Sequence, residues 1–204
     1  MMINRRRVCG GGEKLPQGAV RIEYLESRNG AYIDPLIERD TKYAVDCMFR
    51  LVNASNKIIV PFGFYADVAA LRIYYANRTK KFRLQYQTGD IDTGITVTND
   101  WYKVLFENNR VEINGIIFNG VPYDYRDGYH FLCFASSATN GTAEYYSDDV
   151  TFVDIAHISI SLNNIVLRDL IPVRVGKVGY MYDKVSGQLF GNSGTGEFIL
   201  GPDV

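Results

Sequence analysis

Aromatic and carboxylate side chains alternate most densely between Val121 and Tyr129. Tyrosine combines a large apolar body with a polar tip, which suits a wet surface that stacks on a sugar ring and hydrogen-bonds to it. A further tyrosine pair follows, and Tyr74-Tyr75 is a third cluster. Two alternatives stay open: these side chains bind a carbohydrate, or they pack on a sheet or against a partner protein. The candidate ligand-binding residues are Tyr123, Asp124, Tyr125, Asp127, Tyr129, Tyr145 and Tyr146.

Carboxylate spacing gives no sign of glycoside hydrolysis. That reaction needs two carboxyl groups that flank the scissile bond, about 5–5.5 Å apart in a retaining enzyme. The nearest alternation is Asp90-Ile91-Asp92, which we expect in a loop because glycines flank it. Glu23 and Glu26, three residues apart on a strand, would face opposite ways. We therefore predict that the chain is not an enzyme.

The histidines and cysteines form no nucleophilic or zinc-binding pattern. His130 and Cys133 are three residues apart in an apolar run, and on a strand they would face opposite sides. His157 lies within an alternating strand pattern. Cys9, Cys47 and Cys133 are too few and odd in number for a disulfide framework. We interpret Cys47 and Cys133 as small buried hydrophobic residues, which indicates folding in a reducing compartment.

Charge and hydropathy exclude two classes of partner. The net charge is −1 at pH 7, so no basic field attracts nucleic acid. No apolar stretch approaches the roughly 20 residues of a membrane-spanning helix. The basic N-terminus is followed by glycines instead of an apolar segment, so we see no signal peptide. Residues 1–14 read as a Gly-rich tail, either disordered or an anchor that docks onto a partner through Arg5, Arg6 and Arg7.

From Leu15 onward the hydrophobic pattern has a period of two, which predicts strands. Asn114-Gly115 between apolar runs predicts a tight hairpin, and Asn163-Asn164 predicts another turn. We also predict a central strand over 130–135, a strand that ends at Pro172, and a helical turn near Tyr145–Asp149. No amphipathic helix is evident. The pattern predicts one all-β domain over residues 15–204, a β-sandwich or jelly roll.

Three stretches carry a family resemblance: an opening motif, a strand in the last third, and a glycine-punctuated closing segment. They are Tyr24-Leu25-Glu26-Ser27 with Tyr32-Ile33-Asp34, then His157 to Arg174, then Val178 to Gly187 with Gly191-Asn192-Ser193-Gly194-Thr195-Gly196. This set resembles the concanavalin A-like, laminin G-like domains of gut bacteria and their phages. The resemblance implies a two-sheet antiparallel sandwich, here preceded by a short extended tail. The opening differs at Asp34-Pro35-Leu36, where the family usually has Asp-Thr-Gly, so the loop should differ in shape.

The fold hosts lectins, glycanases and scaffolds, so it does not decide the function. The residues themselves predict no cofactor, and calcium is the one candidate that the resemblance implies, with Asp148 and Asp149 as the weakly supported ligands. A glycanase that has lost its catalytic carboxylates is disfavoured by the missing acid pair.

Our first hypothesis is a non-catalytic bacteriophage virion surface component, whether capsid-decorating, head-fibre or tail-associated, localised to the virion. The sandwich lacks an attached catalytic domain, and the tail would bind other virion proteins within an oligomer or assembly. The alternative is a carbohydrate-binding or adhesion module at the bacterial cell surface.

Overall fold

The computed structural model describes residues 14–37, 43–54, 57–66, 69–86, 89–107, 110–119, 130–137, 143–144, 146–147 and 150–204. These residues form two packed β-sheets and contain no helix, so the all-β sandwich predicted from the sequence is confirmed. Of the predicted tail only Lys14 is described; residues 1–13, including Arg5, Arg6 and Arg7, lie outside the described residues.

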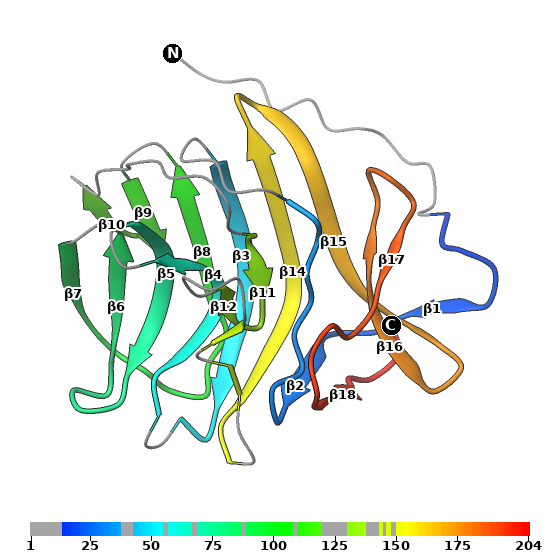
Figure 1. The fold of residues 1–204 in the computed structure, drawn as a ribbon, viewed down its shortest axis with the longest axis horizontal. Helices are drawn as coiled ribbons and strands as arrows, with labels where there is room; N and C mark the ends of the chain where they lie inside the picture. Colours follow the sequence, from blue (N-terminus) through cyan, green and yellow to red (C-terminus); the bar gives the residue numbers. More distant parts are fainter. Residues whose placement is uncertain are drawn as a thin grey trace.

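The larger sheet has the strand order β10-β9-β8-β3-β14-β15-β16-β17, with β1 paired to β15 and β2 paired to both β14 and β18 (Figure 1). Its strands are β1 (Ala19–Arg21), β2 (Leu25–Arg28), β3 (Tyr43–Val52), β8 (Tyr102–Glu107), β9 (Arg110–Ile113), β10 (Ile116–Asn119), β14 (Phe152–Leu162), β15 (Ile165–Val175), β16 (Val178–Asp183), β17 (Leu189–Phe190) and β18 (Glu197–Leu200).

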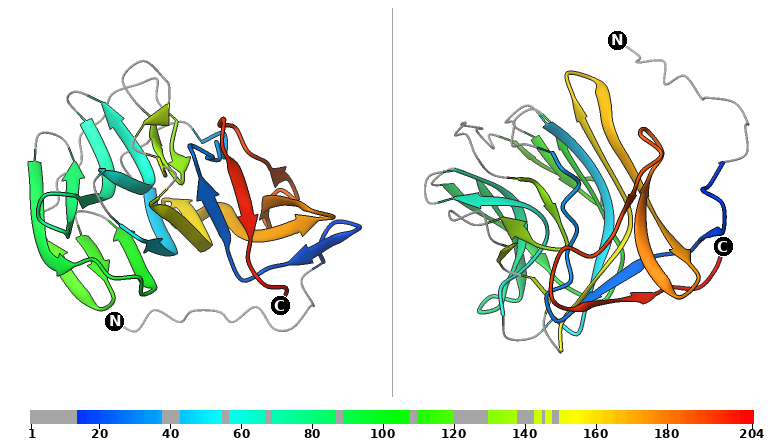
Figure 2. Two further views of the ribbon diagram at one scale, coloured as in Figure 1. Left: turned by 90° about the horizontal axis from the view of Figure 1, so that it is seen from below. Right: turned by 45° about the vertical axis from the view of Figure 1, so that its right-hand side comes forward.

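The smaller sheet has the order β13-β12-β4-β5-β6-β7, with β11 paired to β4. Its strands are β4 (Ile59–Ala66), β5 (Ala69–Ala76), β6 (Lys81–Tyr86), β7 (Gly89–Thr96), β11 (Leu132–Cys133), β12 (Ser136–Ser137) and β13 (Ala143–Glu144). Strand pairing is antiparallel throughout the described residues except for one parallel pair, between β12 and β4. Figure 2 shows this sheet at one end of the molecule and strands β1, β2, β15 and β16–β18 at the other.

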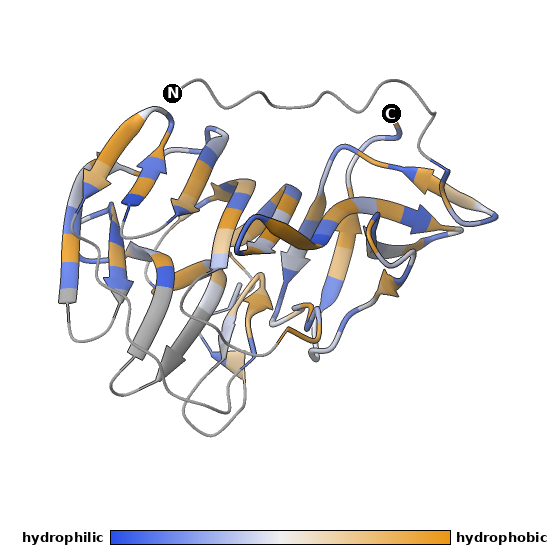
Figure 3. Cartoon of the chain, turned by 90° about the horizontal axis from the view of Figure 1, so that it is seen from above, coloured by the Kyte–Doolittle hydropathy of each residue, from blue (hydrophilic) through white to orange (hydrophobic). Residues whose placement is uncertain are grey.

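The core lies between the sheets because alternate residues of each strand face inward. On β3, Val45, Cys47, Phe49 and Leu51 are fully buried, while the intervening side chains face the opposite side. Figure 3 shows this alternation as bands of hydrophobic and hydrophilic residues along the strands. Phe49 packs edge-on against Phe62 and Phe82 of the smaller sheet, with ring centroids 6.2 and 5.8 Å apart. Aromatic contacts of this kind join the sheets.

The two predicted asparagine turns are confirmed. Asn114 and Gly115 both have positive φ, 48° and 87°, as a tight hairpin between β9 and β10 requires. Asn163 and Asn164, with φ of 51° and 65°, connect β14 to β15 in the same way. The predicted burial of Cys47 and Cys133 is also confirmed, and burial raises the pKa of both thiols.

The opening and closing motifs lie against each other. Ser193 N–H donates to the Tyr32 carbonyl at 2.8 Å, and Asn192 Oδ1 accepts from Tyr32 N–H at 3.3 Å. A Cβ at Gly194 would lie 2.0 Å from the Gly30 carbonyl oxygen, and one at Gly196 would lie 1.9 Å from that of Arg28. The glycines of the closing segment are therefore required by this close backbone approach.

Strand β15 runs through Pro172, so the prediction that a strand ends there was wrong. The proline stands where β15 changes partner. Leu170 pairs with Ile158 of β14, whereas Val173 pairs with Arg21 of β1. Between these ladders the missing N–H removes no hydrogen bond that the sheet needs on that side.

The predicted strand over 130–135 was also wrong, since it is broken at Phe134, whose φ is 69°. Only Leu132–Cys133 forms a strand there, and Ser136–Ser137 forms the next. Asp90 and Asp92 lie on strand β7 and not in a loop as predicted. Leu36 has a positive φ of 55°, a conformation that glycine adopts most easily, and the expected difference in loop shape at Asp34-Pro35-Leu36 stays a prediction.

Candidate functional site

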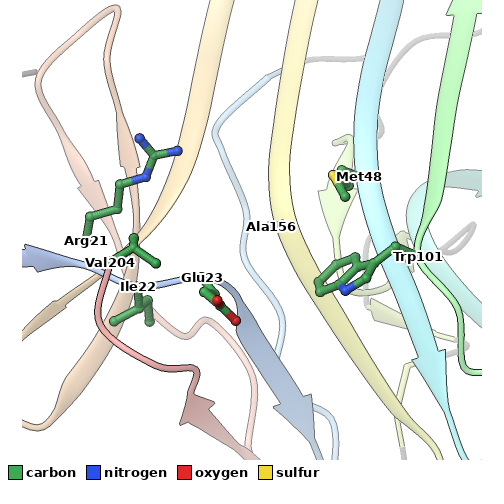
Figure 4. Close-up of a pocket in the computed structure, with 7 residues that line it drawn as sticks. All are labelled: Arg21, Ile22, Glu23, Met48, Trp101, Ala156 and Val204. Atoms are coloured by element: carbon green, nitrogen blue, oxygen red, sulfur yellow. The ribbon is translucent and has the colours of Figure 1, made fainter.

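A pocket of about 560 Å³ lies on the face of the larger sheet that points away from the smaller sheet. It sits where the sheet forks. Strand β14 pairs with β15 through Ile158 and with β2 through Ile155, and a bulge between them contains Ala156 (Figure 1). Because β2 and β15 diverge from this point, the fork leaves an open space. Its lining residues are Arg21, Ile22, Glu23, Met48, Trp101, Ala156 and Val204 (Figure 4).

One wall of the pocket is the segment of residues 22–24, whose backbone is hydrogen-bonded to Pro172 on one side and to residues 201–202 on the other. Ile22 N–H donates to the Pro172 carbonyl at 3.2 Å, and Glu23 N–H donates to the Pro202 carbonyl at 2.8 Å. Gly201 N–H donates to the Tyr24 carbonyl at 3.0 Å. Ile22 itself is buried. These bonds fix the backbone of residues 22–24, so the side chain of Glu23 projects from a rigid base.

Trp101, the only tryptophan of the chain, forms the opposite wall. It directly precedes β8, and its backbone is held by the predicted hairpin turn, since Asn114 Nδ2 donates to the Trp101 carbonyl at 3.4 Å. The Arg50 guanidinium lies 4.9 Å from the Trp101 ring centroid and 4.8 Å from that of Tyr24. The arginine therefore lies against both rings, in two cation–π contacts that hold the tryptophan in place.

Behind Arg50 a row of charged side chains crosses three strands, from β3 through β14 to β2. Arg50 Nε donates to Asp154 Oδ2 at 2.5 Å, and Asp154 is the cross-strand partner of both Arg50 and Glu26. Arg28 Nε donates to Glu26 Oε1 at 2.6 Å, and its guanidinium lies over the Phe152 ring. We call Arg28, Glu26, Asp154 and Arg50 the β2–β3 charge row.

The centre of this row is a pair of buried carboxyl groups. Asp154 is completely buried and Glu26 is 8% exposed. Among the described residues, no donor reaches Asp154 Oδ1. The carboxyl group of Glu26 can satisfy that oxygen only when one of the two carries a proton. Burial raises the pKa of Asp154 to about 6, with Arg50 opposing the shift and Glu26 adding to it.

A second row of charged side chains begins on β14, on the other side of the bulge, and continues to β15 and to the residue that follows β16. His157 Nε2 lies 2.9 Å from Asp169 Oδ1, and Lys184 Nζ lies 2.7 Å from Asp169 Oδ2. Burial acts against ionisation of Asp169, but the bonds from His157 and Lys184 outweigh it and lower the pKa. We call His157, Asp169 and Lys184 the hairpin row, because Lys184 belongs to the β16–β17 hairpin.

The tip of that hairpin is organised by Asp183, which is buried. Its carboxylate accepts from Val185 N–H at 3.1 Å and from Ser186 Oγ at 2.7 Å. Gly187 has φ of 75°. These bonds hold residues 183–187 in a tight turn, so the motif serves the fold. Arg168 Nε donates to the Pro35 carbonyl at 3.0 Å.

Most of the predicted site residues lie outside the described part of the chain. These are the ligand-binding candidates Tyr123, Asp124, Tyr125, Asp127, Tyr129 and Tyr145, and the calcium candidates Asp148 and Asp149. Tyr146 is described: it is 43% exposed and its ring lies against Gly30. Tyr75 is buried in the core, and Tyr74 is buried on the opposite face with its hydroxyl 2.8 Å from Asp90 Oδ2. For these two the packing alternative is confirmed.

Sequence reasoning missed the pocket and both of its walls. Trp101 is the only tryptophan, and that rarity was the one available signal. Glu23 and Glu26 do not share a strand, since β2 begins at Leu25; Glu23 is exposed and Glu26 is buried. Their different roles depend on partners far away in the sequence, at Pro202 and Asp154.

The chain matches no known family model and no curated protein. Within the described part of the chain, no helix is long and apolar enough to cross a membrane. The described residues also bring no three potential ligands among His, Cys, Asp and Glu together around a point where a metal ion could bind.

Proposed function

We propose that this chain is a non-catalytic carbohydrate-binding sandwich of concanavalin A-like type, and that the sugar binds in the Trp101 pocket. The observation that carries the proposal is an aromatic ring held by Arg50 at the edge of an open pocket, with a carboxylate on the facing wall. The volume of about 560 Å³ falls within the roughly 300–1,000 Å³ typical of small-molecule sites.

A sugar ring suits these walls because one of its faces is C–H rich and its edge carries hydroxyl groups. The Trp101 ring offers an apolar surface for the C–H rich face of the sugar. For the sugar hydroxyl groups, the indole N–H of Trp101 is a hydrogen-bond donor and the Glu23 carboxylate is an acceptor. Met48, 40% exposed, adds a polarisable apolar contact beside the ring.

The burial of the charge row supports a binding role without hydrolysis. Glu26 and Asp154 are adjacent carboxyl groups, the pair that a glycosidase needs. However, Asp154 has no exposed surface, and Arg28 and Arg50 occupy both ends of the row. A glycosidic bond cannot reach between these two carboxyl groups, so we assign them to holding Arg50 and, through it, Trp101.

Such a module fits either setting expected from the sequence, a bacteriophage virion or a bacterial cell surface. The choice depends on whether residues 1–14 anchor the chain in an assembly, and it stays a prediction because Arg5, Arg6 and Arg7 lie outside the described residues. Limited proteolysis of the isolated protein and of a particle that contains it tests the anchor. Protection of residues 1–14 only in the particle is the expected result, and equal cleavage in both contradicts it.

The binding proposal is tested with the fluorescence of Trp101, which is the only tryptophan and therefore reports on the pocket alone. A glycan array selects oligosaccharides, and titration with them should change the emission. Calorimetry should then show that Trp101→Ala weakens binding about tenfold or more, whereas Trp101→Phe retains most of it.

Tyr146→Ala is the matched control, since it removes an exposed aromatic ring outside the pocket lining. Its affinity should equal that of the parent protein. If Tyr146→Ala abolishes binding and Trp101→Ala does not, the sugar site lies at the tyrosine cluster instead. If no oligosaccharide binds, the proposed function is wrong.

A further inference from the structure

We propose that the pocket selects an amino sugar with a free, protonated amine, and that Glu23 is the residue that selects it. This inference rests on the proposed function, because it names the class of sugar that the Trp101 pocket takes.

The Glu23 carboxylate is not neutralised within the described part of the chain. It is exposed, it lines the pocket, and no hydrogen bond or ion pair to its side chain is found among the described residues. Its backbone is fixed by the bond from Glu23 N–H to the Pro202 carbonyl. Figure 4 shows the carboxylate on the side of the segment that faces Trp101.

The neighbouring cations already have partners. Arg50 is paired with Asp154 at 2.5 Å, and Arg174 is paired with Asp203 at 2.6 Å. Arg21 also lines the pocket, but Figure 4 shows its guanidinium pointing away from Trp101, and it takes part in an interaction of its own. A ligand that covers Glu23 therefore has to supply the positive charge itself, because a carboxylate that is desolvated without a partner costs free energy.

The facing wall suits the same cation. An ammonium group over the face of tryptophan is attracted by the ring quadrupole. A sugar with an ammonium group can satisfy both walls at once, with its C–H face on Trp101 and its ammonium group at Glu23. A uronic or sialic acid would instead place a second negative charge beside Glu23, which is unfavourable.

A quaternary ammonium ligand fits less well. Such cations are typically enclosed by several aromatic rings. Of the described residues that line this pocket, Trp101 alone is aromatic. A primary ammonium, with three N–H donors, makes better use of a single ring and a carboxylate.

The test compares three trisaccharides on the full chain at about pH 6 and low salt: glucosamine units with free amines, their N-acetylated form, and the glucose form with hydroxyl groups. We expect the free-amine form to bind about tenfold more tightly than the other two. Glu23→Gln should remove this preference, so that the free-amine form binds no more tightly to the variant than the two neutral forms do. Added salt should weaken only the free-amine form.

Glu197→Gln is the matched control, since Glu197 is an exposed glutamate on β18 that does not line the pocket. It should retain the preference. If the three sugars bind equally and Glu23→Gln has no effect, while Trp101→Ala still abolishes binding, the inference is overturned and the proposed function stands.

If no trisaccharide or array sugar responds to Trp101→Ala, the proposed function itself fails. A lysine-rich peptide and choline are included as further probes. If either binds in a way that needs both Glu23 and Trp101 while amino sugars do not bind, the pocket recognises a cation outside a sugar, and the inference is overturned.

Discussion

The β2–β3 charge row and the hairpin row each include a residue of β14 and use similar side chains, but the pKa values of their aspartates shift in opposite directions. In the β2–β3 charge row, Asp154 is completely buried, and burial raises its pKa to about 6 despite Arg50. In the hairpin row, Asp169 keeps about a quarter of its side chain exposed, and His157 and Lys184 lower its pKa. Burial acts against ionisation at both residues. At Asp154 a single arginine does not overcome it and the Glu26 carboxyl adds to it, whereas at Asp169 two partners outweigh it.

The largest expected effect comes from removing the cation of the buried row. Arg50→Met keeps an apolar stem but leaves Asp154 buried without its partner, which should lower the free energy of unfolding by about 3 kcal/mol at pH 8. The loss should shrink at pH 5, because Asp154 is then mostly protonated. Chemical denaturation at the two pH values measures both quantities.

Lys184→Met is the matched control in the hairpin row. Its ion pair is half-exposed, so the expected loss is below about 1 kcal/mol at either pH. An equal loss in both variants would mean that the two rows do not differ in the way proposed.

The second effect is a pH dependence with a defined sign. Because the folded-state pKa of Asp154 is raised from 3.8 to about 6, the folded state binds more protons than the unfolded state between these values. Stability should therefore rise as the pH falls from about 6 to about 4, by up to about 3 kcal/mol from this group. Asp154→Asn should remove this contribution, as seen from the difference between the two unfolding curves. If the difference in unfolding free energy between the parent and Asp154→Asn does not change with pH in this range, the raised pKa of Asp154 is contradicted.

The hairpin row should show the opposite sign. Asp169→Asn should lower the free energy of unfolding by about 1 kcal/mol at pH 7, since its partially exposed contacts with His157 and Lys184 become weaker. In the parent protein this contribution is lost as the pH falls through the lowered pKa of Asp169, below 3.8. The difference between the parent and the variant should therefore be smaller at low pH, which thermal unfolding at pH 3 and pH 7 can measure.

The smallest expected effect is the coupling between the rows. Ser159, the cross-strand partner of Asp169, lies five positions from Asp154 along β14, about 16 Å at 3.3 Å per residue. The effects of Asp154→Asn and Asp169→Asn should add to within about 0.5 kcal/mol. A larger coupling energy in a double-mutant cycle would show that the bulge at Ala156 transmits strain between the rows.

The fold was predictable from the sequence because its signals are local. The alternation from Tyr43 to Leu51 gives both the strand and its buried face, and Asn114-Gly115 gives the hairpin. The errors arose where partners change. Pro172 looked like a strand end because a single strand pattern does not reveal that β15 leaves β14 and joins β1 at that residue.

The candidate site was not predictable because its contacts are between distant parts of the chain. Arg50 lies against Tyr24 and Trp101, and Glu26 faces Asp154, only because β2, β3 and β14 pair in one particular register. No local pattern contains that register. The tyrosine-rich stretch attracted attention because its signal is compositional, and composition does not report which side chains meet.

The double pairing of β2 has a consequence for how the chain reaches its native state. Leu25–Arg28 pairs with β14 on one side and with β18 on the other, so this early segment completes its hydrogen bonds only after Glu197–Leu200 has been synthesised. Contacts between such distant segments slow folding, since a large loop must close before they form. During translation the exposed edge of β2 is open to mispairing with another chain, and completing the last strand closes it.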